Sequence, residues 1–388
     1  MQPPFEGCDE ACPGVKGART FSPPNGKVSG MTLFDSPDFA NHEGVHACFD
    51  ERSGLRTIIA VHSTARGPAA GGCRMWPYAS AEAALTDALR LSQGMSYKNA
   101  MADLPLGGGK AVIIGDARTG KTPALFEAFG QAVDSLGGKY WTAEDVGVSP
   151  ADMAQVRKQT RYVAGLEGHL AASGDPSPVT AEGVFRGVRL CVQRAYDRDL
   201  TGVTVAIQGV GHVGAYLAEK LHAAGAKLII TDVNEAALAQ VAARTGAEIV
   251  APDAIFDVEA QVFAPCALGG AINAQTLSRL KGRVIAGGAN NQLATPEIGA
   301  LLFEQGRLYA PDYVINGGGI INVAAEILGI ETGTAFDAAW VAAKLDRLTE
   351  TLGEVLDRSL AEKRPTHEVA DEMAKARIAQ AVALKAAA

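Results

Sequence analysis

The stretch 204–232 constrains the fold more than any other part of the chain. It reads TVAIQGVGHVGAYLAEKLHAAGAKLIITD: an apolar run, a turn that matches G-x-G-x-x-G, a helical segment, a second apolar run and Asp232. The glycine pattern alone is a weak signal, but this order of strand, turn, helix, strand and acid is the context in which it binds a dinucleotide. The sequence therefore predicts a βαβ unit within a doubly wound, Rossmann-type α/β fold.

Each residue of the turn has a physical role in this prediction. Gly209 permits the tight turn, Gly211 lets a pyrophosphate approach the backbone, and Gly214 lets the helix pack on the strand. Val213 lies where the helix N-terminus faces the phosphates and belongs to the predicted cofactor-binding set. Asp232 is expected to accept hydrogen bonds from the adenosine ribose, and its charge repels a 2′-phosphate, which favours NAD over NADP. The alternative is a glycine-rich turn that binds nothing.

Composition argues against several classes of protein. The chain has 388 residues, is 47% hydrophobic and 20% charged, and has a formal net charge of −8, as expected for a globular protein with more than one domain. That charge favours neither nucleic acid nor an anionic membrane as a partner, and no apolar run reaches the length of a membrane span. The six cysteines form no C-x-x-C pair and no Cys/His cluster with zinc spacing, so we expect no metal site and reduced thiols in a cytoplasmic protein.

Residues 1–30 differ in character from the rest of the chain. They are rich in Pro, Gly and Ser and lack the apolar centre of a secretion signal, which predicts a flexible N-terminal extension. Organised sequence begins at Met31, which is therefore an alternative start of the protein.

The remaining chain alternates short apolar runs with helical stretches. We expect a hairpin over 45–63, a loop in which Gly71 and Gly72 allow close backbone approach, and helices capped by Ser80, Thr122 and Thr180. Short strands are expected at QVFAP, RVIAG and DYVIN, and two long helices are expected on either side of Pro365.

Two lysines, Lys98 and Lys110, stand out in the stretch 92–110, SQGMSYKNAMADLPLGGGK. A helix end is expected between them. Lys110 follows Gly107–Gly109 and precedes the apolar run AVII, so it is expected to open a buried strand, where an unpaired charge is costly. Lys98, Lys110 and Asp145 all fall on expected loops or strand ends outside the dinucleotide unit. No G-x-S-x-G motif occurs and the histidines are dispersed, so the sequence does not indicate a nucleophile triad.

Four motifs carry a resemblance to a known family. They are GGCRMWPY at 71–78, MSYKNAMADLPLGGGKAVI at 95–113, TAEDVGV at 142–148 and GGANNQL at 287–293. From Met31 onward the chain resembles the glutamate/leucine/phenylalanine/valine dehydrogenase family, and most of all its branched-chain and aromatic amino-acid members. The resemblance implies an NAD-dependent enzyme that converts an amino acid to its 2-oxo acid and ammonia.

The resemblance also implies an architecture. A substrate-binding domain with a mixed sheet would comprise 31–165 and about 346–388, and a Rossmann-type NAD domain would comprise 170–345. The active site would lie in the cleft between them, at the carboxyl ends of strands. The family is oligomeric, so we expect a homo-oligomer, either a dimer or an octamer.

Positions that match the family motifs imply the site residues. Lys98 resembles the lysine that pairs with the substrate α-carboxylate, Lys110 the catalytic lysine and Asp145 the catalytic aspartate. Gly72 matches a backbone position beside that carboxylate. Two asparagines match residues between substrate and nicotinamide, and a threonine matches a residue near the nicotinamide amide; these are Asn290, Asn291 and Thr180.

These residue types suit the reaction. Hydride leaves Cα for the nicotinamide, water adds to the resulting iminium, and ammonia leaves. A neutral amine suits the base that activates the water, so we expect burial and the nearby Lys98 to lower the pKa of Lys110. Asp145 would then carry protons to and from the substrate nitrogen. The alternative for Asp145 is structural, as a cap of the helix near Ser149 or as the partner of an arginine.

The side-chain pocket is expected to be apolar. Where glutamate-specific relatives bind the second substrate carboxylate, this chain has Ala70 and Val323, and a buried carboxylate without a partner is costly. Ala143 and the β-branched Ile320 favour leucine, valine or isoleucine, whereas the small Ala70 favours a roomier pocket, which would suit phenylalanine.

Three alternatives stay open: the same chemistry on phenylalanine, a catalytically silent NAD-binding relative, and an unrelated Rossmann dehydrogenase. The intact set of Lys98, Lys110 and Asp145 argues against a silent relative. An unrelated dehydrogenase would need a catalytic histidine or a Tyr-x-x-x-Lys pair, whereas Tyr97 is directly adjacent to Lys98.

Overall fold

The structure is a computed structural model that describes residues 33–387, so the expectations for the N-terminal extension and its alternative start lie outside the described residues. The chain separates into two compact units, Met1–Phe39 and Ala40–Ala388. The described part of the first unit carries a 3-10 turn, η1 (Leu33–Asp35), and the elements below belong to the second unit. Among the described residues, no helix is both long and apolar enough to cross a membrane.

The first half of the second unit is built on a mixed six-stranded sheet. Its strands are β1 (Gly44–Asp50), β2 (Leu55–Ser63), β3 (Ala69–Ala70), β4 (Cys73–Trp76), β5 (Gly107–Ile114) and β6 (Tyr140–Trp141). Their order is β1-β2-β5-β3-β6, with β4 also paired to β5. β2 runs antiparallel to both of its neighbours, β1 and β5, whereas β3, β4 and β6 run parallel to their partners. The hairpin expected over 45–63 is confirmed, and the two-residue strand β3 lies in a stretch expected to be a loop.

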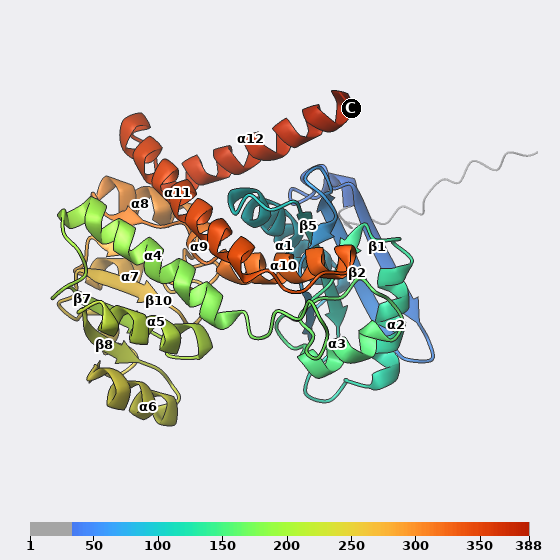
Figure 1. The fold of residues 1–388 in the computed structure, drawn as a ribbon, viewed down its shortest axis with the longest axis horizontal. Helices are drawn as coiled ribbons and strands as arrows, with labels where there is room; N and C mark the ends of the chain where they lie inside the picture. The colour runs from blue at the N-terminus through green and yellow to red at the C-terminus, as the bar shows by residue number, and fades with distance from the viewer. Residues whose placement is uncertain (1–32, 388) are drawn as a thin grey trace, which may run out of the picture. The chain divides into compact units, whose positions relative to one another are not determined.

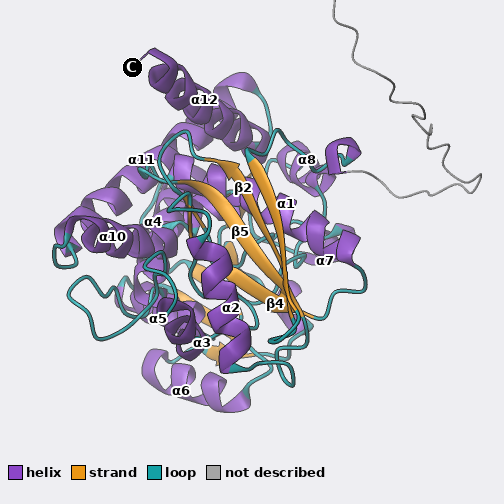
Figure 2. Cartoon of the chain, turned by 90° about the vertical axis from the view of Figure 1, so that its right-hand side faces the viewer, coloured by secondary structure: helices purple, strands orange, loops and turns teal. Residues whose placement is uncertain are grey.

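Helices cover both faces of this sheet (Figure 2). They are α1 (Ala81–Met101), α2 (Pro123–Asp134) and α3 (Pro150–Arg157). The apolar side chains of α2 and α3 share a core with alternate residues of β5, such as Ala111 and Ile113. α1 packs on the other face, where a Cβ at Gly108 would collide with Ser96. Because side chains alternate along a strand, Lys110 points to the α1 face and away from the α2–α3 core.

Two expectations about the lysines are wrong in detail. Ser80 caps α1 as expected, and the helix ends at Met101, between the two lysines as expected, but Lys98 lies in its last turn rather than on a loop. β5 begins at Gly107, so Lys110 lies inside the strand rather than at its start. The glycines belong to the strand because neighbouring segments approach them closely, and a Cβ at Gly107 would collide with a carbonyl oxygen of β2.

The second half is built on a parallel six-stranded sheet in the order β12-β11-β10-β7-β8-β9 (Figure 1). Its strands are β7 (Thr204–Gln208), β8 (Lys227–Thr231), β9 (Glu248–Ile249), β10 (Val262–Pro265), β11 (Val284–Ile285) and β12 (Leu308–Tyr309). Its helices are α4 (Ser177–Tyr196), α5 (His212–Ala223), α6 (Glu235–Thr245), α7 (Ala274–Arg279), α8 (Pro296–Glu304), α9 (Asp312–Ile315) and α10 (Gly318–Thr332), with a 3-10 turn, η2 (Ala254–Phe256). The strand order reverses between β7 and β10, the switch point of a doubly wound sheet, so the predicted Rossmann-type fold is confirmed.

Two segments of this half differ from expectation. DYVIN, expected as a strand, forms the short helix α9, and the last strand is instead β12, which pairs with β11. A short apolar run has no periodicity that separates strand from helix, and Pro311 cannot continue the strand's hydrogen bonds. Thr180 does not cap α4, because the helix begins at Ser177 and the Thr180 hydroxyl donates to the Pro176 carbonyl within the first turn.

Two long helices complete the chain and meet at Pro365 as expected (Figure 1). They are α11 (Ala338–Glu362) and α12 (Thr366–Ala387). α12 returns to the first half, where Arg377 donates to the carbonyls of Ala100 and Met101 at the end of α1. The residue limits given above for the two domains stay a prediction.

Candidate active site

A cavity of about 920 Å³ opens between the two halves of the second unit. The first half lines it with α1, β5 and the loop after β6, and the second half with α10 and the loop after β11. All predicted catalytic and substrate-binding residues line it, together with one predicted cofactor residue: Ala70, Gly72, Lys98, Lys110, Ala143, Asp145, Asn290, Asn291, Ile320 and Val323. Folding therefore brings together residues that are far apart in the sequence.

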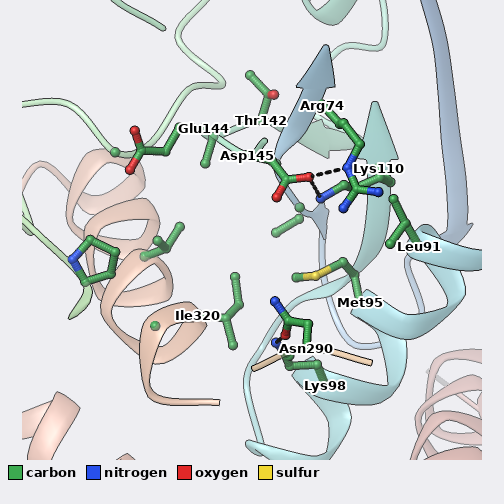
Figure 3. Close-up of a pocket in the computed structure, with 18 of the residues that line it drawn as sticks. Arg74, Leu91, Met95, Lys98, Lys110, Thr142, Glu144, Asp145, Asn290 and Ile320 are labelled. Carbon is green, nitrogen blue, oxygen red and sulfur yellow. Dashed lines mark hydrogen bonds and ion pairs between the residues drawn. The ribbon is translucent and has the colours of Figure 1, made fainter. Parts of the chain in front are cut away.

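Lys110 and Asp145 form an ion pair in the wall of this cavity (Figure 3). Lys110 Nζ lies 2.7 Å from Asp145 Oδ2, and Arg74 Nε donates to the same oxygen at 3.2 Å. The Lys110 side chain is only 7% exposed and that of Asp145 23%, so the pair is largely out of water. Burial opposes ionisation of Asp145, but the positive charges of Lys110 and Arg74 outweigh it and hold the pKa of Asp145 at about 2. Asp145 is therefore a carboxylate at neutral pH.

Backbone contacts between distant segments place Asp145. The N–H groups of Cys73 and Met75 in β4 donate at 2.8 and 2.9 Å to carbonyls on either side of it. Gly72 lets these segments approach, because a Cβ there would lie 2.9 Å from the Asp145 Cβ and would collide with the Glu144 carbonyl oxygen. The glycine motif and the acidic loop thus form one packed structure.

Lys98 reaches the cavity from the last turn of α1 and bridges the two halves. Its Nζ donates to Asn290 Oδ1 at 3.0 Å. Burial lowers the pKa of Lys98 to about 8; the carboxylate of Asp312 opposes this shift and the charge of Lys110 adds to it. A pKa lowered by burial is therefore found at Lys98, which the sequence led us to expect only as a charged anchor for the substrate carboxylate.

Helix α9 fixes the loop that carries Asn290. Asn316 Nδ2 donates to Asn290 Oδ1 at 2.8 Å, and Asp312 Oδ2 accepts from the N–H of Gln292 at 2.9 Å. Asn291 adopts a left-handed backbone, with φ of 51°. The two asparagines of the GGANNQL motif are thus held by a helix that the sequence analysis expected to be a strand.

The structural alternative for Asp145 is partly right. Ser149 and Asp152 cap α3 with a reciprocal capping box, so Asp145 is not its cap. Asp145 does pair with an arginine, Arg74, which the sequence analysis did not single out although it lies within the GGCRMWPY motif. Its position as a charged residue between apolar residues of a short strand was an available signal. Asp312 offered none, because a short apolar run such as DYVIN predicts a strand as readily as the helix α9 that it begins.

The apolar wall of the cavity contains more residues than expected. Ala70, Ala143, Ile320 and Val323 line it as predicted, and so do residues that the sequence analysis missed: Leu91, Met95, Trp141 and Ile327. Leu91, Met95 and Lys98 follow one another at helical spacing on one face of α1. Figure 3 shows Met95 on the α1 side and Ile320 on the α10 side of the cavity.

The glycine turn lies beside this cavity and contributes only His212 to its lining. Gly209 has φ of +96°, and a Cβ there would crowd Ala267; a Cβ at Gly214 would collide with the Gly209 carbonyl oxygen. At Gly211, by contrast, a Cβ would meet nothing within 4 Å. Two glycines are therefore required by packing, and the third leaves the backbone open to an approaching group.

The start of α5 suits a phosphate. The helix has no side-chain cap, so its first N–H groups are not used by a capping side chain. Val213, the second residue of α5, lies against Gly288, with its Cγ1 2.9 Å from where a Cβ would stand. The Thr180 hydroxyl, in α4, lies against Gly319, 2.8 Å from where a Cβ would stand. Gly319 lines the cavity, whereas the two predicted cofactor residues, Val213 and Thr180, do not.

Asp232 directly follows β8, as the dinucleotide pattern requires. Its Oδ2 accepts from the N–H of Val210 at 2.7 Å and its Oδ1 from the N–H of Asn234 at 2.8 Å. The carboxylate is thereby fixed at the mouth of the glycine turn. An open glycine, an uncapped helix start and an acid at the next strand end together fit a dinucleotide.

Comparison with known families follows the same division of the chain. A family profile described as "Glu/Leu/Phe/Val dehydrogenase, dimerisation domain" matches residues 43–162. A second, described as "Glutamate/Leucine/Phenylalanine/Valine dehydrogenase", matches residues 175–238 and 228–385. The chain belongs to the Glu/Leu/Phe/Val dehydrogenase family. It is therefore an amino-acid dehydrogenase that uses a nicotinamide cofactor, and the resemblance found in its motifs is confirmed.

Relatives of this dehydrogenase match it over nearly their whole length. The leucine dehydrogenase of Geobacillus stearothermophilus is 48% identical over 349 residues, which cover 90% of this chain and 94% of the relative. The phenylalanine dehydrogenase of Bacillus thermotolerans is 44% identical over 354 residues, which cover 90% of this chain and 91% of the relative. The crystal structure of L-tryptophan dehydrogenase from Nostoc punctiforme matches with a TM-score of 0.77 and 38% identity, over 88% of this chain and 96% of that one.

Proposed function

We propose that this dehydrogenase catalyses the reversible, NAD-dependent oxidative deamination of a branched-chain L-amino acid (leucine, valine or isoleucine) to the 2-oxo acid and ammonia. The similarity to leucine dehydrogenases and the apolar wall of the cavity support this substrate class. The single observation that carries the chemistry is the Lys110–Asp145 pair, at 2.7 Å, in the wall of a cavity that Lys98 also lines.

Each charged residue has one task in this proposal. Lys98 binds the substrate α-carboxylate in place of the Asn290 amide oxygen that it contacts in the free protein. The bound nicotinamide supplies the hydride acceptor. Lys110, as a neutral amine, takes a proton from the attacking water and, as an ammonium, polarises the carbinolamine oxygen. Asp145 exchanges protons with the substrate nitrogen, and its contact with Lys110 provides a path for the proton.

Glutamate is a poor substrate in this proposal. Ala70 and Val323 stand in the cavity wall at the positions that match the carboxylate-binding residues of glutamate-specific relatives. A side-chain carboxylate against these residues would lose hydration without gaining a partner, at a cost on the order of several kcal/mol.

Phenylalanine is the second candidate substrate. The small Ala70 in the wall leaves room for a larger side chain, and a phenylalanine dehydrogenase is among the similar proteins. The β-branched Ile320 lines the cavity on the side opposite Met95 (Figure 3) and reduces the room for a large side chain. Because each methylene contributes only about 1–3 kcal/mol to such discrimination, the branched-chain preference depends on a small difference in packing.

The cofactor in this proposal is NAD rather than NADP. Asp232 is held at the mouth of the glycine turn, where its negative charge opposes a 2′-phosphate and its oxygens suit the ribose hydroxyls.

A substrate screen tests the proposal. The full chain is incubated with NAD and, separately, with leucine, valine, isoleucine, phenylalanine and glutamate, and NADH absorbance is followed. We expect the highest kcat/KM for a branched-chain substrate and almost none for glutamate. The highest value for phenylalanine would select the second candidate, and no turnover of any amino acid by a protein that binds NADH would contradict both.

We further propose a homo-oligomer, either a dimer or an octamer, in which residues 43–162 supply contacts between copies. The profile that matches these residues is described as a dimerisation domain. Light scattering of the full chain would measure the mass, and a monomer at micromolar concentration would contradict the proposal. The cytoplasmic location stays a prediction.

A further inference from the structure

The stretch 163–174, here called the connecting segment, links the two halves and is matched by neither family profile. It contains no helix, and its three glycines (Gly165, Gly168 and Gly174) have positive φ and open space where a Cβ would stand. The path of the segment is therefore not fixed by its own secondary structure. Residues at both of its ends nevertheless line the cavity: Gly165, Leu166, Glu167, Ser173 and Gly174.

Helix α10 presents one face to the cavity and another to the connecting segment. The cavity face follows the spacing i, i+3, i+7 and consists of Ile320, Val323 and Ile327. The other face follows the spacing i, i+4, i+7 and consists of Asn322, Glu326 and Gly329. At Gly329, a Cβ would lie 2.6 Å from the Cβ of Ala171, so the absence of a side chain lets the segment approach the helix. A shift of the segment against α10 would therefore alter the cavity wall next to Val323.

Glu326 is the centre of the second face. Its side chain is 0% exposed, and both carboxylate oxygens are used by the connecting segment. Oε1 accepts from the N–H groups of Gly165 at 2.9 Å and Leu166 at 3.3 Å, and lies 3.2 Å from His169 Nε2. Oε2 accepts from the N–H of Ser173 at 3.3 Å and from its hydroxyl at 2.5 Å. A buried carboxylate is tolerated only when donors compensate its charge, and here the segment supplies them.

Asn322, one turn before Glu326 on α10, makes a further hydrogen bond to Ser173. Its Nδ2 donates to the Ser173 carbonyl at 3.2 Å. Ser173 is thus bound at its N–H, its hydroxyl and its carbonyl by two residues of one helix. These bonds fix Ser173, which lines the cavity, against α10. Val323 lies on the same helix, so the bonds also fix Ser173 relative to Val323.

We propose that Glu326 is a positioning residue for substrate binding, which holds the connecting segment against α10 and so fixes the cavity wall beside the substrate side chain. The inference rests on the proposed function, because it concerns the affinity of that substrate. The proton-exchanging residues, Lys110 and Asp145, lie on β5 and the β6 loop and make no contact with Glu326 among the hydrogen bonds of the described residues. Loosening the segment should therefore raise KM and relax side-chain selectivity more than it lowers kcat.

The test compares three variants of the full chain at saturating NAD. Glu326→Gln keeps the shape but replaces one accepting oxygen by an NH2 group, which faces the Ser173 or the Gly165 donors. We expect KM for leucine to rise about tenfold, as for the loss of a charge-assisted hydrogen bond, with kcat within about threefold of wild type. The ratio of kcat/KM for leucine over phenylalanine should fall. Ser173→Ala removes one hydroxyl donor but leaves the backbone N–H donors to Glu326 in place, so its KM should rise less, by about threefold.

Glu331→Gln is the matched control, because it makes the same chemical change at an exposed residue of the same helix. It should leave KM, kcat and selectivity unchanged. Amide hydrogen exchange gives a readout without turnover: Glu326→Gln should speed exchange at Gly165, Leu166 and Ser173 but not at Ala164, whose N–H donates to the Thr142 carbonyl.

The outcomes separate this inference from the proposed function. If wild type deaminates leucine but KM and selectivity stay within twofold of wild type in both variants, Glu326 has only a structural role and the inference is wrong. If Glu326→Gln does not fold, the KM of Ser173→Ala decides by the same criterion. If wild type binds NADH but turns over no amino acid, the proposed function is wrong and this inference falls with it.

Discussion

The two halves of the molecule build their parts of the site in different ways. In the first half, Lys110, Asp145 and Arg74 come from three separate segments and meet in ion pairs that are mostly shielded from water. In the second half, Gly209–Gly214 is one continuous stretch, which offers backbone N–H groups and the open space at Gly211. One part depends on charged side chains held by distant backbone, and the other on the local geometry of a turn.

The difference teaches which property each half controls. Side chains that are already paired in the free protein are pre-organised for proton transfer, so changes to them should alter the rate. An open backbone cradle forms its contacts only when a ligand arrives, so changes to it should alter cofactor affinity or choice. Lys98 stands between the two, because its Nζ contacts Asn290 of the other half.

Lys110→Ala is expected to have the largest effect on the rate, which the first half is expected to control. The variant removes the amine that we propose accepts the water proton, while Arg74 still holds Asp145. We expect kcat to fall on the order of 10³-fold, as for loss of a general base, with NADH affinity unchanged in a fluorescence titration. Lys158→Ala, at an exposed lysine paired with Glu127, is the control. Activity above about a tenth of wild type would remove Lys110 from the mechanism.

Arg74→Met should have the next largest effect. Asp145 keeps Lys110 but loses its second cation, so kcat/KM should fall about thirtyfold. The pKa of Asp145, which is about 2 in the wild type, should rise in this variant. The carboxylate then becomes protonated at a higher pH, and the acidic limb of the pH–rate profile shifts to higher pH. Arg118→Met, at an exposed pair with Asp116, should leave the profile in place. An unmoved acidic limb would mean that Arg74 does not tune Asp145.

Asp232→Gly should change cofactor choice without changing the chemistry. Removing the charge relieves the repulsion of a 2′-phosphate, so the ratio of kcat/KM for NADP over NAD should rise about tenfold. Asp232→Asn separates charge from hydrogen bonding, because the amide oxygen can still accept from Val210 or Asn234. An unchanged cofactor ratio in both variants would count against the ribose-binding role of Asp232.

The smallest effect is expected from pH alone and concerns Lys98. Its pKa of about 8 means that the ammonium is lost as pH rises through that value. The ammonium fraction falls about tenfold from pH 7 to 9, so KM for the 2-oxo acid, which carries no titrating amine, should increase by up to about tenfold over that range. Lys98→Arg keeps the charge over this range and should flatten the rise. A KM that does not depend on pH in wild type would show that Lys98 does not bind the carboxylate as an ammonium.

Much of the site could be predicted because its residues lie in long motifs or in one local unit. The strand, turn, helix and acid of 204–232 all lie where the sequence placed them, since hydrogen bonds and glycine geometry within a short stretch decide them. Lys98, Lys110 and Asp145 were found through family motifs rather than through spacing. Arg74 was missed, because pairing with Asp145 depends on the alignment of β4 with the β6 loop.

Errors of secondary structure arose where short segments depend on their neighbours. The short apolar run DYVIN is compatible with either a strand or a helix. Two tertiary contacts decide in favour of the helix: β12 takes the place beside β11 in the sheet, and Asp312 bonds to the loop that carries the two asparagines. The three glycines before Lys110 are part of a strand because β2 and α1 approach them closely, a constraint that composition does not reveal.

The sequence by itself determined the strand, turn and helix of the doubly wound unit, because local hydrogen bonding and glycine geometry specify them. Its motifs also pointed to the residues proposed to carry the chemistry and to an apolar cavity wall. Only the tertiary structure decided which charges meet and which segment forms the wall beside them. The reason is that ion pairs and buried carboxylates such as Glu326 depend on distances between segments far apart in the chain, and packing of whole elements sets those distances.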